Sequence, residues 1–164
     1  MTFNYQGIVH IKTKRNVHVI HNLGAQALFN IFAEFLVGNT TRMTDTKSIQ
    51  LFYGTPAELL NSSTAHQDAV VSHKIPLKSQ QIECMDKTTN AYGATFYTTV
   101  KQEFLIEKTA QHTDYSAGLF SGNILLAMIG FKKDVYEDII NGGRADIKWT
   151  MMLSNVAKVQ EEKL

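Results

Sequence analysis

The sequence predicts an α+β fold made mainly of antiparallel β-sheet, a β-sandwich-like domain with one principal buried helix near residues 22–37. Apolar and polar residues alternate along several segments, which is the period of a half-buried strand. Clusters of Gly, Pro, Asn and Asp separate these segments at short intervals, as they do in all-β domains. No repeat, linker or low-complexity stretch interrupts the sequence, so we expect residues 1–164 to form a single domain.

The first expected element is a β-hairpin over residues 7–21. Two alternating runs, Gly7–Thr13 and Val17–His21, flank a polar turn at Lys14–Asn16. A three-residue loop places alternate side chains on opposite faces, which suits a half-buried sheet. One predicted face holds Val9, Ile11, Thr13, Val17 and Val19, and the other holds His10, Lys12 and His18.

The hairpin is followed by the predicted helix. Asn22 is a suitable N-cap, and Gly38 is placed to end the helix after Val37. The polar residues Gln26 and Asn30 recur at a spacing of four with Glu34, so they form one thin stripe. The rest of the segment is apolar, which predicts burial over most of the circumference. The helix is either the central core helix or is shared with a neighbouring subunit.

The remaining segments are predicted to be strands. A polar, threonine-rich loop at Asn39–Ser48 leads into them, and Pro76 places its own region at a sheet edge. Asn123 to Phe131 is continuously apolar, as in a strand covered on both faces. After a turn at Asn141–Gly143, Trp149 is expected to face the core. The predicted strands are residues 49–53, 69–73, 77–85, 92–106, 123–131 and 145–153.

Composition restricts the possible partners. Hydrophobic residues make up 44% of the chain and charged residues 19%, below the usual quarter, which indicates surface covered by partners. A formal net charge of +1 gives no electrostatic reason to expect nucleic acid or an acidic membrane. The apolar run at Leu23–Val37 is too short and too polar to span a bilayer. The first residues lack the features of a signal peptide, so we expect synthesis in the cytosol.

The histidines do not form a convincing metal site. In the predicted register His21 lies opposite to His10 and His18, and no carboxylate is near in sequence. His66 and His73 lie seven residues apart, and His112 stands beside Asp114 in a lone pair. We therefore expect sheet or surface histidines and assign no metal ligand.

The search for catalytic motifs also assigns no residue. Cys84 lies in a packed strand, where a thiol behaves as a small hydrophobe. Gly118–Gly122 contains a serine but precedes a strand rather than a helix, so we read it as a turn joining two strands. The acidic group Asp134, Glu137 and Asp138 has the wrong spacing for a calcium loop and is read as a solvated turn. Gly142-Gly143 lacks a phosphate-binding lysine motif. We predict no catalytic, cofactor-binding or metal-binding residues and no enzyme activity.

Two stretches nevertheless resemble a pattern found in small virion proteins of tailed bacteriophages. One is His21–Phe29, which opens an apolar helix after an N-terminal hairpin. The other is Tyr115–Ala127, a Gly-Leu-Phe turn before a Leu-Ala strand, followed by the Ile-x-Trp-Thr strand at Ala145–Met151. Ile49–Thr55 is similar to the strand and turn between them. Together the matches cover about half of the chain.

This resemblance implies a structural component of the tail, baseplate, collar, fibre attachment or head surface of a virion, synthesised in the host cytoplasm. It implies other virion proteins as partners and a homo-oligomer, and it transfers no catalytic residue. The alternative from the residues themselves is a soluble β-sandwich ligand-binding module, with carbohydrate as the candidate ligand. In that case Tyr53, Tyr92 and Tyr97 are the side chains expected to stack on the ligand.

Overall fold

The computed structural model describes residues 3–24, 28, 33–34, 36–38, 47–57, 75–86 and 91–155. Within these residues the fold is mainly antiparallel β, as predicted, with the α-helix α3 at Lys133–Gly142 and the short 3₁₀ helix η1 at Gln102–Phe104. The strands are β1 (Phe3–Lys12), β2 (Val17–Gly24), β3 (Lys47–Tyr53), β4 (Ile75–Pro76), β5 (Ser79–Asp86), β6 (Ala91–Lys101), β7 (Asp114–Ser121), β8 (Ile124–Lys132) and β9 (Arg144–Asn155).

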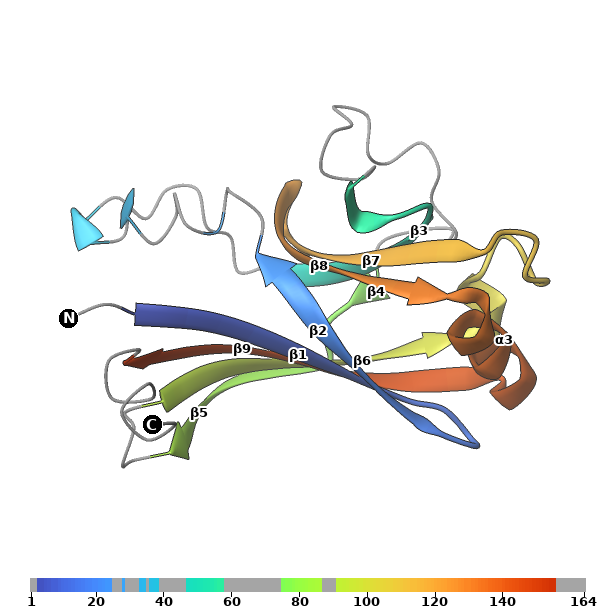
Figure 1. Ribbon diagram of the computed structural model, residues 1–164, viewed down its shortest axis with the longest axis horizontal. Helices are drawn as coiled ribbons and strands as arrows, with labels where there is room; N and C mark the ends of the chain where they lie inside the picture. Colours follow the sequence, from blue (N-terminus) through green and yellow to red (C-terminus); the bar gives the residue numbers. More distant parts are fainter. Residues whose placement is uncertain are drawn as a thin grey trace, which may run out of the picture.

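The strands form two facing layers joined by β2 (Figure 1). The first sheet has the order β2-β1-β9-β6-β5, and the second has the order β4-β3-β7-β8-β2. Val17 to Asn22 of β2 pair with β1, and then Leu23 and Gly24 pair with β8. A strand that changes sheets in this way makes the corner of a sandwich. On the other side, Lys78 N, just after β4, donates a hydrogen bond to Tyr97 O of β6 at 2.7 Å, so the layers are linked there too.

The core lies between the two layers. Trp149 is 0% exposed, and its β9 neighbours Ile147 and Met151 are buried on the same face, as predicted. Tyr115 of β7 and Tyr136 of α3 are also fully buried and belong to this core. A second, smaller cluster of Phe52, Phe120 and Met128 is buried on the other face of the second sheet. Both faces of that sheet are therefore apolar, which explains its long apolar sequence runs.

Several predicted strands are confirmed with shifted ends. The alternation over residues 92–106 corresponds to β6, but the strand stops at Lys101, where η1 turns the chain. The turn predicted at Gly118–Gly122 is narrower, because Gly118 lies inside β7 and only Gly122-Asn123 link it to β8. Gly122 has a φ of 59°, a left-handed conformation that suits a two-residue hairpin turn. Pro76 lies in the edge strand β4, as expected.

The predicted faces of the N-terminal hairpin are wrong for β2. Lys12, not Thr13, pairs with Val17, so the loop has four residues, Thr13–Asn16. Thr13 Oγ1 accepts hydrogen bonds from the backbone N of Arg15 at 3.3 Å and of Asn16 at 3.1 Å, which favours the longer loop. A shift of one residue moves every side chain of a strand to the opposite face. Val17 and Val19 consequently share the outer face, each 56% exposed.

The predicted start of the helix near residues 22–37 is also wrong. Asn22 is not an N-cap but a residue of β2, paired with Gly7 of β1. A Cβ at Gly7 would stand 1.2 Å from Asn22 Oδ1, so the missing side chain makes room for the buried Asn22, whose Nδ2 donates to Tyr5 Oη at 3.1 Å. Of the later segment, residues 28, 33, 34 and 36 are helical. Leu28 is buried, but Leu36 is 85% exposed and Val37 83%, so burial does not extend to the end of the segment.

The segment read as a solvated acidic turn is instead the helix α3. Val135, Tyr136 and Ile139 lie on one helical face and are buried, which stabilises the helix against the sheets. Gly143 ends the helix in a left-handed conformation with φ 78°, and its N donates to Ile140 O at 3.1 Å. Figure 1 shows α3 at one end of the two layers.

Some sequence predictions fall outside the described residues. These include the strand at residues 69–73 and most of the loop at residues 39–48. Phe3 to Gln6, at the N-terminus, belong to β1 and pair with Asn155 to Met152 of β9.

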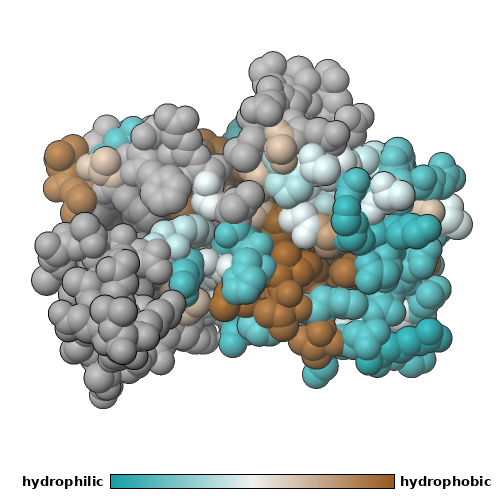
Figure 2. Space-filling model, in the orientation of Figure 1, coloured by the Kyte–Doolittle hydropathy of each residue, from teal (hydrophilic) through white to brown (hydrophobic). Residues whose placement is uncertain are grey.

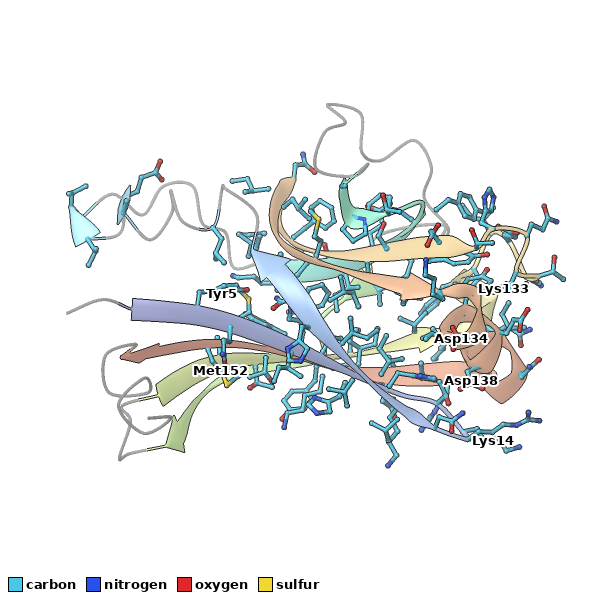
Figure 3. All side chains as sticks on the ribbon, viewed as in Figure 1. Tyr5, Lys14, Lys133, Asp134, Asp138 and Met152 are labelled. Atoms are coloured by element: carbon cyan, nitrogen blue, oxygen red, sulfur yellow. The ribbon has the colours of Figure 1, made fainter. Side chains whose placement is uncertain are left out.

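The hairpin turn docks on α3. Asp138 Oδ2 accepts a hydrogen bond from Asn16 Nδ2 at 2.7 Å and lies 2.7 Å from His18 Nε2. Lys14 packs against Gly142, where an added Cβ would stand 3.1 Å from Lys14 Cβ. Figure 3 shows Asp138 on α3 near the turn that carries Lys14. The hydrogen bonds from Asn16 and His18 hold the pKa of the Asp138 carboxyl below its usual value. These contacts tie the first sheet to the helix.

Replacing Trp149 by alanine should lower the free energy of unfolding by about 3–5 kcal/mol, because a fully buried indole leaves a large cavity. Urea unfolding followed by circular dichroism measures the change, with Val19→Ala on the exposed face as the control expected to cost far less. Trp149 is the only tryptophan, so native fluorescence should be blue-shifted. Emission at the wavelength of free tryptophan in water contradicts this placement.

Replacing Asp138 by asparagine should reduce the acid dependence of stability. The folded-state pKa of Asp138 is lowered, so its contribution is present above the unfolded carboxyl pKa of about 4 and is lost as pH falls through the folded value. The free energy of unfolding of Asp138→Asn should therefore fall less steeply below about pH 5 than that of the wild type. Glu137→Gln, at an exposed position of the same helix, is the matched control. Equal slopes for the wild type and Asp138→Asn contradict the assignment.

Candidate functional site

A groove on the outer face of the first sheet is the main candidate binding site. It has a volume of about 450 Å³, within the range of small-ligand sites. We call it the sheet groove. Four strands and the link after β4 supply its lining, which consists of His10, Lys12, Val17, Lys78, Tyr97, Thr98, Thr99, Asp146, Ile147 and Lys148.

Strand register explains why these residues meet. His10 of β1 pairs with Lys148 of β9, which pairs with Tyr97 of β6. Because directly paired residues share a face, these three side chains form one row across the sheet. The groove therefore runs across the strands, and its lining comes from distant parts of the sequence.

The next row is Lys12, Asp146 and Thr99, paired in the same way. Thr99 Oγ1 donates to Asp146 Oδ1 at 2.8 Å, and Arg144 Nη2 lies 3.8 Å from Asp146 Oδ2. Both carboxylate oxygens of Asp146 thus have partners within the protein. For the three lysines of the lining, by contrast, the structure describes no ion pair.

Tyr97 gives the groove an aromatic surface. Its side chain is half-buried, and Lys148 Nζ lies 6.0 Å from the ring centroid, at the limit of a cation–π contact. Val17 adds an exposed aliphatic side chain at the other end of the groove. The site combines one aromatic ring, one aliphatic group and several cationic groups.

An aromatic cluster near α3 is the second candidate. The rings of Tyr115 and Tyr136 stack at 4.4 Å with an interplanar angle of 6°, and Tyr115 also stacks on Phe131 at 5.8 Å. Tyr53 stacks on His112 at 4.3 Å. Tyr53 therefore packs inside this cluster, away from the sheet groove.

The polar atoms of the cluster hold the segment that follows η1. Tyr136 Oη donates to Glu107 O, Gln111 N donates to Glu107 Oε1 at 2.8 Å, and His112 Nε2 lies 3.9 Å from Glu107 Oε2. Burial raises the pKa of both the Tyr115 and the Tyr136 hydroxyl. Phenols of raised pKa stay neutral and donate hydrogen bonds, which suits a structural role.

The structure separates the histidines that the sequence placed together. His10 lies on the outer face in the groove, and His21 shares that face because it pairs with Ile8, whereas His18 is held by Asp138 on the opposite face. Among the described residues, no group of three or more His, Cys, Asp and Glu side chains could hold a metal ion. Cys84 lies in β5 opposite Tyr92, and His66 and His73 lie outside the described residues.

Exposed hydrophobic residues mark another part of the surface. Leu36 and Val37 are the most exposed large hydrophobic side chains of the described chain. The described residues of this segment, drawn in cyan, lie at the left end of Figure 1, and Figure 2 shows hydrophobic surface at the same end. Contiguous exposed apolar patches occur at many protein–protein contacts, so this neighbouring pair is a candidate contact surface.

Sequence reasoning named Tyr97 as a possible ligand contact but missed the lysines around it. Lys12 and Lys148 each occupy an outward position of an alternating strand, which is where lysines normally lie in solvent. Only the pairing of β1 with β9 brings them to one place. No sequence signal marks that convergence.

No protein-family model, curated protein or solved structure matches this chain. Within the described residues, no helix is both long and apolar enough to cross a membrane.

Proposed function

We propose that this chain is a non-catalytic structural subunit of a tailed-bacteriophage particle, which acts by multi-copy assembly with other virion proteins. The exposed pair Leu36 and Val37 is the observation that supports assembly most directly. Both aliphatic side chains are more than four-fifths exposed. Burying them against a partner surface removes apolar area from water, which stabilises the complex. The particle itself rests on the resemblance of residues 21–29, 115–127 and 145–151.

The composition of the chain supports the same role. Only 19% of the residues are charged, and hydrophobic residues make up 44%. A low charge share with exposed aliphatic groups is typical of surfaces that neighbouring subunits cover. The partners are other virion proteins and further copies of this chain, which is made in the host cytoplasm and ends in the virion.

The competing function is a soluble ligand-binding module with tyrosines as the contact residues. Of the three tyrosines, Tyr97 lines the groove and Tyr53 packs in the aromatic cluster. The side chain of Tyr92 lies outside the described ones. An assembly subunit can also carry a ligand site with one tyrosine, so the groove does not distinguish the two functions. The oligomeric state does, because only the assembly function requires self-association or a partner subunit.

Replacing Leu36 by aspartate should weaken self-association or binding to partner virion proteins, because a charge at the contact must be desolvated. Light scattering coupled to size-exclusion chromatography measures the oligomer, and mass spectrometry of purified particles measures incorporation. We expect a specific interface of at least about 1,000 Å² for the wild type.

Ile106→Asp is the matched control, since Ile106 is 62% exposed but follows η1 in a different part of the chain. It should leave assembly unchanged. A wild-type chain that stays monomeric and is missing from purified particles rules out the proposed function.

A further inference from the structure

We infer that the sheet groove binds an acidic saccharide, a chain of pyranose rings that carry anionic groups. The inference rests on the lining of the groove and does not depend on the assembly role. Three features carry it: an excess of positive charge, an aromatic platform, and a direction across the strands.

The charge of the groove differs from that of the chain. The whole chain has a formal net charge of +1, whereas the groove alone holds three lysines, Lys12, Lys78 and Lys148, against the single carboxylate of Asp146. That carboxylate already has Thr99 and Arg144 as partners. No ion pair described in the structure involves any of the three lysines, and all three side chains line the groove. Charge complementarity therefore favours an anionic ligand.

The aromatic ring of Tyr97 indicates which class of anionic ligand fits the groove. Its side chain is half-buried and pairs across the sheet with Lys148, and Lys78 lines the same groove. An aromatic ring presents an apolar face on which the C–H side of a sugar ring can stack, and its hydroxyl gives a hydrogen bond. A bare inorganic anion gains nothing from such a platform, so the combination favours a sugar with acidic substituents.

The direction of the groove argues against a peptide. Its rows join residues of β1, β9 and β6 on the face of the sheet, perpendicular to the strands. An extended peptide commonly binds a sheet by adding a strand at its edge, where backbone groups are free to pair. Here the backbone groups of three inner strands already pair with one another. A ligand on this face must be recognised by side chains, as a sugar is.

The test titrates the full chain with a trimer of galacturonic acid and with the neutral trimer maltotriose, using calorimetry and NMR. We expect saturable binding of the acidic trimer, at least about tenfold tighter than that of the neutral one, and weakened by added salt. Tyr97→Ala and Lys148→Gln should each weaken it by about tenfold or more. Tyr97→Phe, which keeps the platform, should retain most of the binding, and the circular dichroism of Tyr97→Ala should match that of the wild type if its loss of binding is not misfolding.

Lys133→Gln is the matched charge control, because Lys133 is an exposed lysine on α3 outside the groove (Figure 3). It should bind like the wild type. A hexamer of glutamate is titrated in parallel as an acidic peptide. Equal binding of the neutral trimer, equal or tighter binding of the peptide, or no binding of the acidic trimer overturns the inference. None of these outcomes bears on oligomerisation or particle incorporation, which test the assembly role separately.

Discussion

The hydrogen-bonded turn between β1 and β2 sets the register on which the rest of the first sheet depends. Thr13 N donates to Asn16 O at 2.8 Å, and the Thr13 hydroxyl joins the same turn. With this four-residue loop, Val9 and Ile11 face the core while Val17 and Val19 face outward. A three-residue loop reverses the faces of β2. It would bury His21 and place His18 on the outer face, away from Asp138. The Thr13 hydroxyl therefore helps to determine which side chains of β2 face the core and which face outward.

The corner between the sheets imposes a second constraint. β2 can pass from β1 to β8 only if its last residues leave the first sheet, and the buried Asn22 lies where that happens. Gly7 is the residue that admits it, because any Cβ there meets the Asn22 amide. The amide donates to the Tyr5 hydroxyl, and burial raises the pKa of that phenol, so the donor and acceptor pair stays neutral. The amide nitrogen of Asn22 thus has a hydrogen-bond partner at the corner, whereas its Oδ1 is buried without one.

Sequence patterns were sufficient where a strand has one buried face. The alternation in β9 predicted that Trp149 faces the core. They failed where charge masked an apolar stripe: Val135, Tyr136 and Ile139 have helical spacing, but the acidic residues between them suggested a turn. The sheet groove could not be predicted at all. Its rows depend on the pairing of β1, β9 and β6, and periodicity within one strand carries no information about its neighbours.

The outer face of the first sheet combines buried hydroxyl groups with aromatic and cationic side chains. Threonines 95, 99 and 150 on this face are buried, and beside them lie Tyr97 and Lys148. The threonines mark a part of this face that is out of contact with water, and the lysine marks a part that still reaches it. The Thr99 hydroxyl donates a hydrogen bond to Asp146, the only acidic side chain of the groove lining, and so fixes its position there. The lining therefore holds three lysines against one carboxylate that already has protein partners, and the inference of an anionic ligand depends on this balance.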